Sequence, residues 1–125
     1  MEAAHNVDDQ PMRALSIRQP YAELILRGEK TIEYRSRPTR IIGERFYIYA
    51  SRKWAGMDAL DNCAAHMSPD ELPTGVIVGS AIISDCTKGE QYYEWHLTDV
   101  ERLDELRKPT RQPQPVWFVP FRDAA

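Results

Sequence analysis

The segment that most constrains the fold is Arg45–Ala50, which is rich in aromatic and β-branched residues. Such side chains fit the pleated, buried surface of a sheet, so this segment predicts a central strand. Residues 13–17 alternate polar and apolar and predict a second, short strand. Residues 76–83 form an apolar run interrupted at Gly79 and Ser80, which predicts a buried strand with a bend or bulge.

Residues 95–106 are compatible with two structures. The first part, residues 95–99, alternates as in a strand, whereas Val100, Leu103 and Leu106 recur at helical spacing. A proline-rich loop and a closing strand over residues 116–119 follow. We therefore prefer the strand interpretation.

Two short helices are expected. Pro20 suits the first turn of a helix that continues through residues 21–27, and Gly28 suits its left-handed C-terminal cap. Residues 57–67 have helical apolar spacing. Five or six strands with two short helices predict a mostly β, α+β fold: a small barrel, in which closure removes exposed strand edges.

The chain of 125 residues predicts one domain, over residues 13–122, preceded by a disordered leader over residues 1–12. It contains no apolar run long enough for a membrane span and no export signal pattern. We therefore expect a cytoplasmic protein with no membrane partner, in which the two cysteines, Cys63 and Cys86, are reduced.

Charge is distributed unevenly along the chain. Residues 13–53 contain ten Lys and Arg and four Glu, a net charge of +6, although the whole chain carries −3. Binding follows the local field rather than the total, so a basic segment within an acidic protein indicates an anionic partner such as nucleic acid. Charge runs are also common on ordinary solvated faces, so the asymmetry adds only modest support.

Residues 30–35 place chemically useful side chains together. In an extended segment Glu33 and Arg35 share one face, while Lys30 and Tyr34 lie on the other, from which Lys30 can reach over the strand edge. A carboxylate between an amine and a guanidinium would hold both cations while leaving donors free for a phosphate or a base edge. The alternative is a surface strand with solvated ion pairs, which the spacing alone slightly favours.

Lys30 itself has three interpretations: a phosphate-binding cation, a neutral amine base, or a member of a structural ion pair. Glu33 opposes the amine base, because a nearby carboxylate stabilises the ammonium unless Arg35 occupies it. We favour the binding role.

Aromatic side chains near cations are candidates for base stacking. Tyr21 and Tyr34 are expected in the core more often than in a site, whereas Trp54 is the better stacking candidate. Tyr92, Tyr93 and Trp95 are expected to pack under a loop.

Metal binding has little support. Cys63-x-x-His66 offers two ligands on one helical face, and no second pair occurs at suitable spacing. We expect no metal and no cofactor. Cys86 ends an apolar run and is expected to be inert, and His96 is expected to be a packed or surface residue.

Four motifs together resemble the ASCH domain, in the version found at the C-terminus of the activating signal cointegrator. They are Leu15-Ser16-Ile17-x-Gln19-Pro20-Tyr21-Ala22, Gly28-x-Lys30-x-x-Glu33-x-Arg35-Ser36, Ile48-Tyr49-Ala50-Ser51 and Gly75-x-x-x-Gly79. The resemblance covers residues 13–122. It implies a PUA-like β-barrel with a cleft beside the first helix, and it makes Lys30, Glu33 and Arg35 cleft residues.

The resemblance implies several functions. Family members bind RNA or DNA, some within transcription or translation regulation, and others are amidohydrolases acting on N4-acetylcytidine or ribonucleases. The amidohydrolases have a threonine at the position of Glu33, and no glutamate can be chosen among Glu90, Glu94 and Glu101 as their distant carboxylate, so that activity is not transferred. Residues 111–115 lack the glycine common before the last strand, so the geometry of this loop is open.

The leading hypothesis is a non-catalytic, monomeric module that binds RNA, single-stranded nucleic acid or a nucleotide. The residues expected to contact it are Lys30, Glu33, Arg35, Ser36, Arg37, Arg18, Gln19, Tyr21, Ser51, Arg52, Lys53 and Trp54. The rival is a small hydrolase of a modified nucleoside, or a ribonuclease, with Lys30 and Glu33 as its acid and base. A third hypothesis is a protein-interaction module with an acidic partner.

Overall fold

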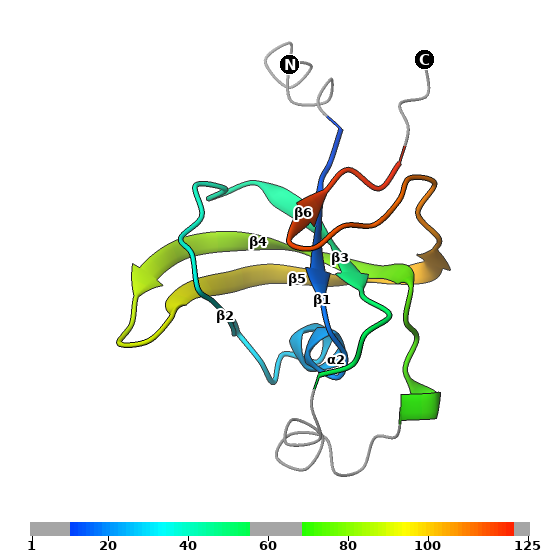
Figure 1. Ribbon diagram of the computed structural model, residues 1–125, viewed down its shortest axis with the longest axis horizontal. Coiled ribbons are helices and arrows are strands. Elements are labelled where there is room, and N and C mark those ends of the chain that lie inside the picture. Colours follow the sequence, from blue (N-terminus) through cyan, green and yellow to red (C-terminus); the bar gives the residue numbers. More distant parts are fainter. Residues whose placement is uncertain (1–10, 56–68, 122–125) are drawn as a thin grey trace.

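The computed structural model describes residues 11–55 and 69–121 of the chain. This part forms one six-stranded sheet with a short α-helix and a 3₁₀ helix (Figure 1). The elements are β1 (Ala14–Ile17), α2 (Tyr21–Leu26), β2 (Ile32–Arg35), β3 (Arg45–Ala50), η1 (Pro69–Glu71), β4 (Val76–Lys88), β5 (Tyr93–Arg107) and β6 (Trp117–Phe118). The predicted leader falls mainly outside the described residues, as do the predicted helix over residues 57–67 and the Cys63–His66 pair.

The strands follow the order β2-β5-β4-β3-β1-β6, and every neighbouring pair is antiparallel except β1 and β3. The long strands β4 and β5 carry different neighbours at their two ends: β5 pairs with β2 through residues 93–96, and β4 pairs with β3 through residues 76–82. The sheet therefore curls into a half-barrel, which confirms the small, mostly β barrel predicted from the sequence (Figure 1). Within the described residues β2 and β6 remain edge strands. The expected closure of the barrel by backbone hydrogen bonds is therefore not observed there.

Gly79 marks the predicted irregularity in β4. The register of β4 against β5 shifts between Ile77 and Gly79, and a Cβ atom at Gly79 would collide with the carbonyl oxygen of Glu101 and lie 2.5 Å from a methyl group of Leu26. Only glycine lets the end of α2 approach the sheet this closely. The absence of a side chain at Gly79 therefore lets α2 pack closely against β4.

Strand β3 is buried on both faces. Phe46 and Ile48 point into the main core, whereas Tyr49 packs into a second cluster with Phe118 and Ile77. This two-sided burial explains why the segment lacks the polar alternation of a half-exposed strand. Its predicted central place in the sheet is confirmed.

Side-chain packing brings β5, the neighbour of the edge strand β2, against the opposite edge strand β6. The rings of Trp95 on β5 and Trp117 on β6 stack with centroids 6.0 Å apart, and the Trp95 indole N–H donates to the carbonyl oxygen of Arg37. Trp95 is therefore packed as predicted, and the segment around it is the preferred strand, β5. The expectation of packing is wrong for Tyr34 and Tyr92, whose side chains are half exposed.

Helix α2 is fixed to the sheet through Glu23, which is buried. Its carboxylate accepts hydrogen bonds from Arg27 at 2.9 Å and from both terminal nitrogens of Arg102 on β5, at 3.1 and 3.0 Å. Burial alone would raise the pKa of Glu23, but the hydrogen bonds from Arg102 and Arg27 outweigh it, and the pKa is lowered. The same contact raises the pKa of Arg102.

The end of α2 follows the predicted pattern. Gly28 adopts a left-handed conformation with φ of 81°, and its N–H donates to the carbonyl oxygen of Ile25. None of the helices in the described ranges is long and apolar enough to cross a bilayer.

Candidate functional site

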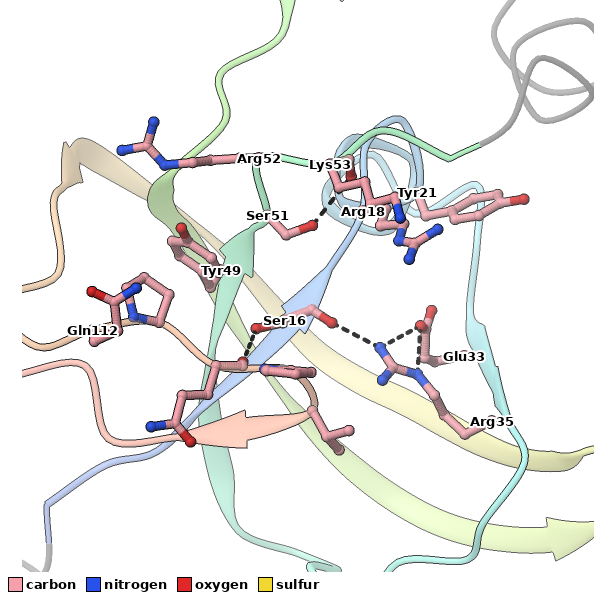
Figure 2. A pocket seen from close by; sticks show the side chains of 14 residues that line it. Ser16, Arg18, Tyr21, Glu33, Arg35, Tyr49, Ser51, Arg52, Lys53 and Gln112 are labelled. Atoms are coloured by element: carbon pink, nitrogen blue, oxygen red, sulfur yellow. Dashed lines mark hydrogen bonds and ion pairs between the residues drawn. The ribbon is translucent and has the colours of Figure 1, made fainter.

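An open cleft of about 610 Å³ lies where several chain segments meet. Strand β1 supplies Ser16 and, just after it, Arg18; β2 supplies Glu33 and Arg35; and β3 supplies Tyr49. Residues 51–53, which follow β3, and residues 112–116, which precede β6, complete the lining, and Tyr21 contributes from α2. Figure 2 shows this cleft from close by.

The pair Glu33 and Arg35 forms one side of the cleft. The Nε and Nη2 atoms of Arg35 lie 2.9 and 2.8 Å from the same carboxylate oxygen, Oε2 of Glu33. Nη2 also donates to the carbonyl oxygen of Ser16, so Arg35 ties β2 to β1 (Figure 2). The predicted same-face pairing is confirmed, and because Glu33 is only 7% exposed, the alternative of a solvated surface pair is wrong.

Lys30 approaches the same carboxylate from the other side. Its Nζ lies 3.7 Å from Oε1 of Glu33 and donates a hydrogen bond of 2.7 Å to the carbonyl oxygen of Ile32. Oε1 is buried and receives no hydrogen bond from the described residues. Such an atom is unusual in a folded protein and marks Glu33 as a candidate for a role beyond packing.

Three more cations surround the cleft. Arg18, Arg52 and Lys53 are exposed, and no carboxylate of the described residues lies within ion-pair distance of them. In the view of Figure 2, Arg18 and Lys53 extend toward the Arg35–Glu33 pair, whereas Arg52 extends the other way. Four cations and one carboxylate line the cleft, so its lining carries a net charge of +3.

The wall before β6 is the part that the sequence did not predict. The Ser16 hydroxyl donates to the carbonyl oxygen of Gln114, and the Ser16 N–H donates to that of Val116, which fixes this loop against β1. Val116 adopts φ of 65°, a left-handed conformation that is unusual for a β-branched residue. Val116 directly follows residues 111–115, the loop whose geometry the sequence left open.

The predicted site residues separate into three groups. Arg18, Tyr21, Glu33, Arg35, Ser51, Arg52 and Lys53 line the cleft. Lys30 lines an adjoining cleft that shares Tyr21 and Glu33 with the first. Ser36, Arg37, Gln19 and Trp54 line neither.

Gln19 has a structural role that its burial reveals. Its side-chain nitrogen donates to the carbonyl oxygen of Pro73, and its side-chain oxygen accepts from the backbone N–H of Glu23 at the start of α2. The amide thus holds the helix and the loop before β4 in place. Gln19 therefore stabilises the packing of α2 and this loop and does not line the cleft.

The basic segment of the sequence does not form one patch. Arg13 pairs with Glu44, Arg27 with Glu23, and Arg45 with Asp99. These pairs leave fewer cations for the cleft than the net +6 suggests. Among the described residues no group of three or more His, Cys, Asp and Glu is placed to hold a metal ion.

The protein is a curled half-barrel with a cationic cleft beside its first helix. These two features together define its structural class. The sequence matches the ASCH domain over residues 15–116, and the chain belongs to the ASCH domain family. Its small barrel is consistent with the PUA-like fold. A search of curated protein sequences finds no match.

Solved structures support the same fold. The ASCH protein from Zymomonas mobilis is 16% identical, with a TM-score of 0.60 over 87% of each chain. Two mutants of that protein are similar, one with 17% identity and a TM-score of 0.60 over 89% of each chain. The other has 15% identity and a TM-score of 0.61 over 88% of this chain and 90% of that one. At this level of identity the likeness concerns the fold alone.

Proposed function

We propose that the cleft binds nucleic acid, with single-stranded RNA as its ligand. The observation that carries the proposal is the composition of the cleft lining: Arg18, Arg35, Arg52 and Lys53 against a single carboxylate, Glu33. A field of this sign attracts phosphates, and positive grooves that follow the nucleic-acid backbone are a feature of single-strand binding. Membership of the ASCH domain family supports the same class of ligand.

The side chains that line the first cleft would contact different parts of the ligand, according to their chemistry. Arg18 and Lys53 are exposed cations that would contact phosphate oxygens, with Arg52 further along the cleft. Arg35 is held by Glu33 and by the Ser16 carbonyl, so it offers a fixed rather than a mobile guanidinium. Tyr21, which is partly exposed, presents ring surface in the same cleft, against which a base or sugar would pack.

The test compares two pairs of cations that differ in place. Arg18→Ser with Lys53→Ser removes two cleft cations, and Arg37→Ser with Arg40→Ser removes two exposed cations outside both clefts. Titration with a single-stranded RNA pool over a range of salt should show about tenfold weaker binding for the first pair. The slope of log affinity against log salt should also fall by about 1.4, because each phosphate contact on a single strand contributes about 0.7.

The control pair should change affinity by less than about threefold. Equal losses for both pairs would mean that diffuse charge, not the cleft, attracts RNA. Absence of binding to any RNA or DNA pool at low salt would overturn the proposal entirely.

A hydrolase is the second candidate, and one observation favours it. Lys30 places an amine 3.7 Å from the buried Glu33 oxygen that lacks a hydrogen-bond donor among the described residues. An adjacent amine and carboxylate can act as acid and base on a nucleoside or on RNA. Turnover of acetylated cytidine or cleavage of RNA that disappears in Lys30→Arg, with RNA affinity retained, would favour this enzyme over a binding module.

A further inference from the structure

A second open cleft of about 800 Å³ adjoins the first. Tyr21 and Glu33 belong to the linings of both, so the two clefts meet at these side chains. The second cleft lies among the chain before β2, β2 itself, α2 and the turn between β4 and β5, where Tyr92 is found.

The two clefts differ in charge. The first has a lining charge of +3, whereas the second contains Lys30 against Glu29 and Glu33, a net charge of −1. A phosphate therefore gains little from the second cleft as a whole. A neutral group of the same ligand suits it better.

Three tyrosines, Tyr21, Tyr34 and Tyr92, line the second cleft. Tyr34 and Tyr92 are each 52% exposed, although tyrosine rings gain free energy from burial. They come from β2 and from the β4–β5 turn, and both line the same cleft. Exposed rings beside a cation are the usual platform for unpaired bases, because every base has a face that can stack.

Lys30 lines the second cleft and contacts both side chains that the two clefts share, Tyr21 and Glu33. Its ammonium lies 5.0 Å from the ring centroid of Tyr21 and 5.1 Å from that of Tyr34, and its side chain is 17% exposed. The hydrogen bond to Ile32 uses one of its three N–H donors. An ammonium held in this way is placed to meet the phosphate that links two neighbouring nucleotides.

We infer that the second cleft is a base-stacking subsite, occupied by the nucleotide next to the one whose phosphate lies in the first cleft. This inference rests on the proposed function and extends it: the ligand is a single strand of at least two nucleotides. Tyr34 and Tyr92 receive the neighbouring base, and Lys30 contacts the phosphate between the two nucleotides. The paired bases of a duplex would not enter this subsite, because they stack on one another.

The test uses ligands of increasing length. Calorimetry with adenosine monophosphate, the adenylate dinucleotide and the adenylate tetranucleotide is carried out on the unmodified protein and on Tyr34→Ser with Tyr92→Ser. The double variant should bind the monophosphate with unchanged affinity and the dinucleotide and tetranucleotide about tenfold more weakly, the size expected for loss of one stacked base.

The ring-preserving variant Tyr34→Phe with Tyr92→Phe is the control and should bind all three ligands as the unmodified protein does. Both tyrosines are half exposed, so thermal unfolding midpoints should agree among the three proteins. Equal losses at every length, or none at any length, would overturn the stacking subsite while leaving the phosphate-binding cleft intact. No binding of any length by the unmodified protein would instead overturn the proposed function and, with it, the subsite.

Discussion

Two glutamates, Glu23 and Glu33, are buried to the same extent, each only 7% exposed, yet their surroundings differ. Glu23 has both oxygens hydrogen-bonded, by Arg27 and Arg102, and joins α2 to β5. Glu33 has one oxygen bonded to Arg35, while Oε1 receives no hydrogen bond from the described part of the chain. The first lines neither cleft, and the second lines both.

The difference separates a structural carboxylate from a functional candidate. Buried polar atoms are nearly always hydrogen-bonded, and an exception calls for an explanation. At Glu23 the fold supplies all the donors, so the residue stabilises the native state. At Glu33 the oxygen without a donor belongs to a side chain that lines both clefts, and it faces the Lys30 ammonium at 3.7 Å.

The largest expected effect concerns stability. Glu23→Gln removes the charge from hydrogen bonds with two arginines and should lower the free energy of unfolding by about 2 kcal/mol. Glu33→Gln should cost less than about 1 kcal/mol, because one oxygen already lacks a donor. Urea denaturation of both variants measures the difference, and a larger loss at Glu33 would reverse the assignment of roles.

The next effect is smaller: lowering the pH should reduce the stabilisation that the Glu23 carboxylate contributes. The folded-state pKa of Glu23 lies below its ordinary value of 4.5, so its stabilisation is present above pH 4.5 and is lost as the pH falls through the lowered pKa. The gap in unfolding free energy between the unmodified protein and Glu23→Gln should therefore shrink by less than about 1 kcal/mol near pH 4. A gap that stays constant from pH 7 to pH 3 would contradict the contribution of the Arg102 and Arg27 contacts.

The smallest expected effect concerns the backbone at two left-handed positions, one after α2 and one in the cleft wall before β6. After α2 the left-handed position is occupied by Gly28, but at the cleft wall it is occupied by Val116. Val116→Gly should raise the free energy of unfolding by less than about 1 kcal/mol, because relief of strain of about 1–2 kcal/mol is partly offset by the entropy of glycine. Val76→Gly, at the first residue of β4, where φ is not positive, is the control and should lower the free energy of unfolding.

The sequence predicted the parts of the molecule that depend on local pattern. Alternation placed Glu33 and Arg35 on one face, proline and glycine delimited α2, and the resemblance to the ASCH domain identified the barrel. The hydrogen bond from Arg35 to Glu33 confirms the first expectation, the bounds of α2 and the left-handed Gly28 agree with the second, and the family match and the fold confirm the third. Each depends on residues close together in the chain or on a motif of fixed spacing.

The parts that could not be predicted depend on distant contacts. Arg45 counts toward the net charge of +6 of residues 13–53, but the fold brings a carboxylate oxygen of Asp99 to 2.7 Å from its guanidinium. The hydrogen bond between Ser16 and Gln114 joins positions 98 residues apart. Tyr34 was expected in the core and Tyr92 under a loop, and only their places on an edge strand and in a turn explain why they are exposed.

The hydrogen bonds from Ser16 to the loop before β6 have a consequence for synthesis in the cell. A ribosome releases the N-terminal part of a chain first, so Arg18, Glu33 and Arg35 emerge well before residues 112–116. The nascent polypeptide therefore carries the cations of the cleft before it has the opposite wall. The cleft is therefore incomplete until residues 112–116 have been synthesised, and a chain stalled before residue 112 would lack this wall.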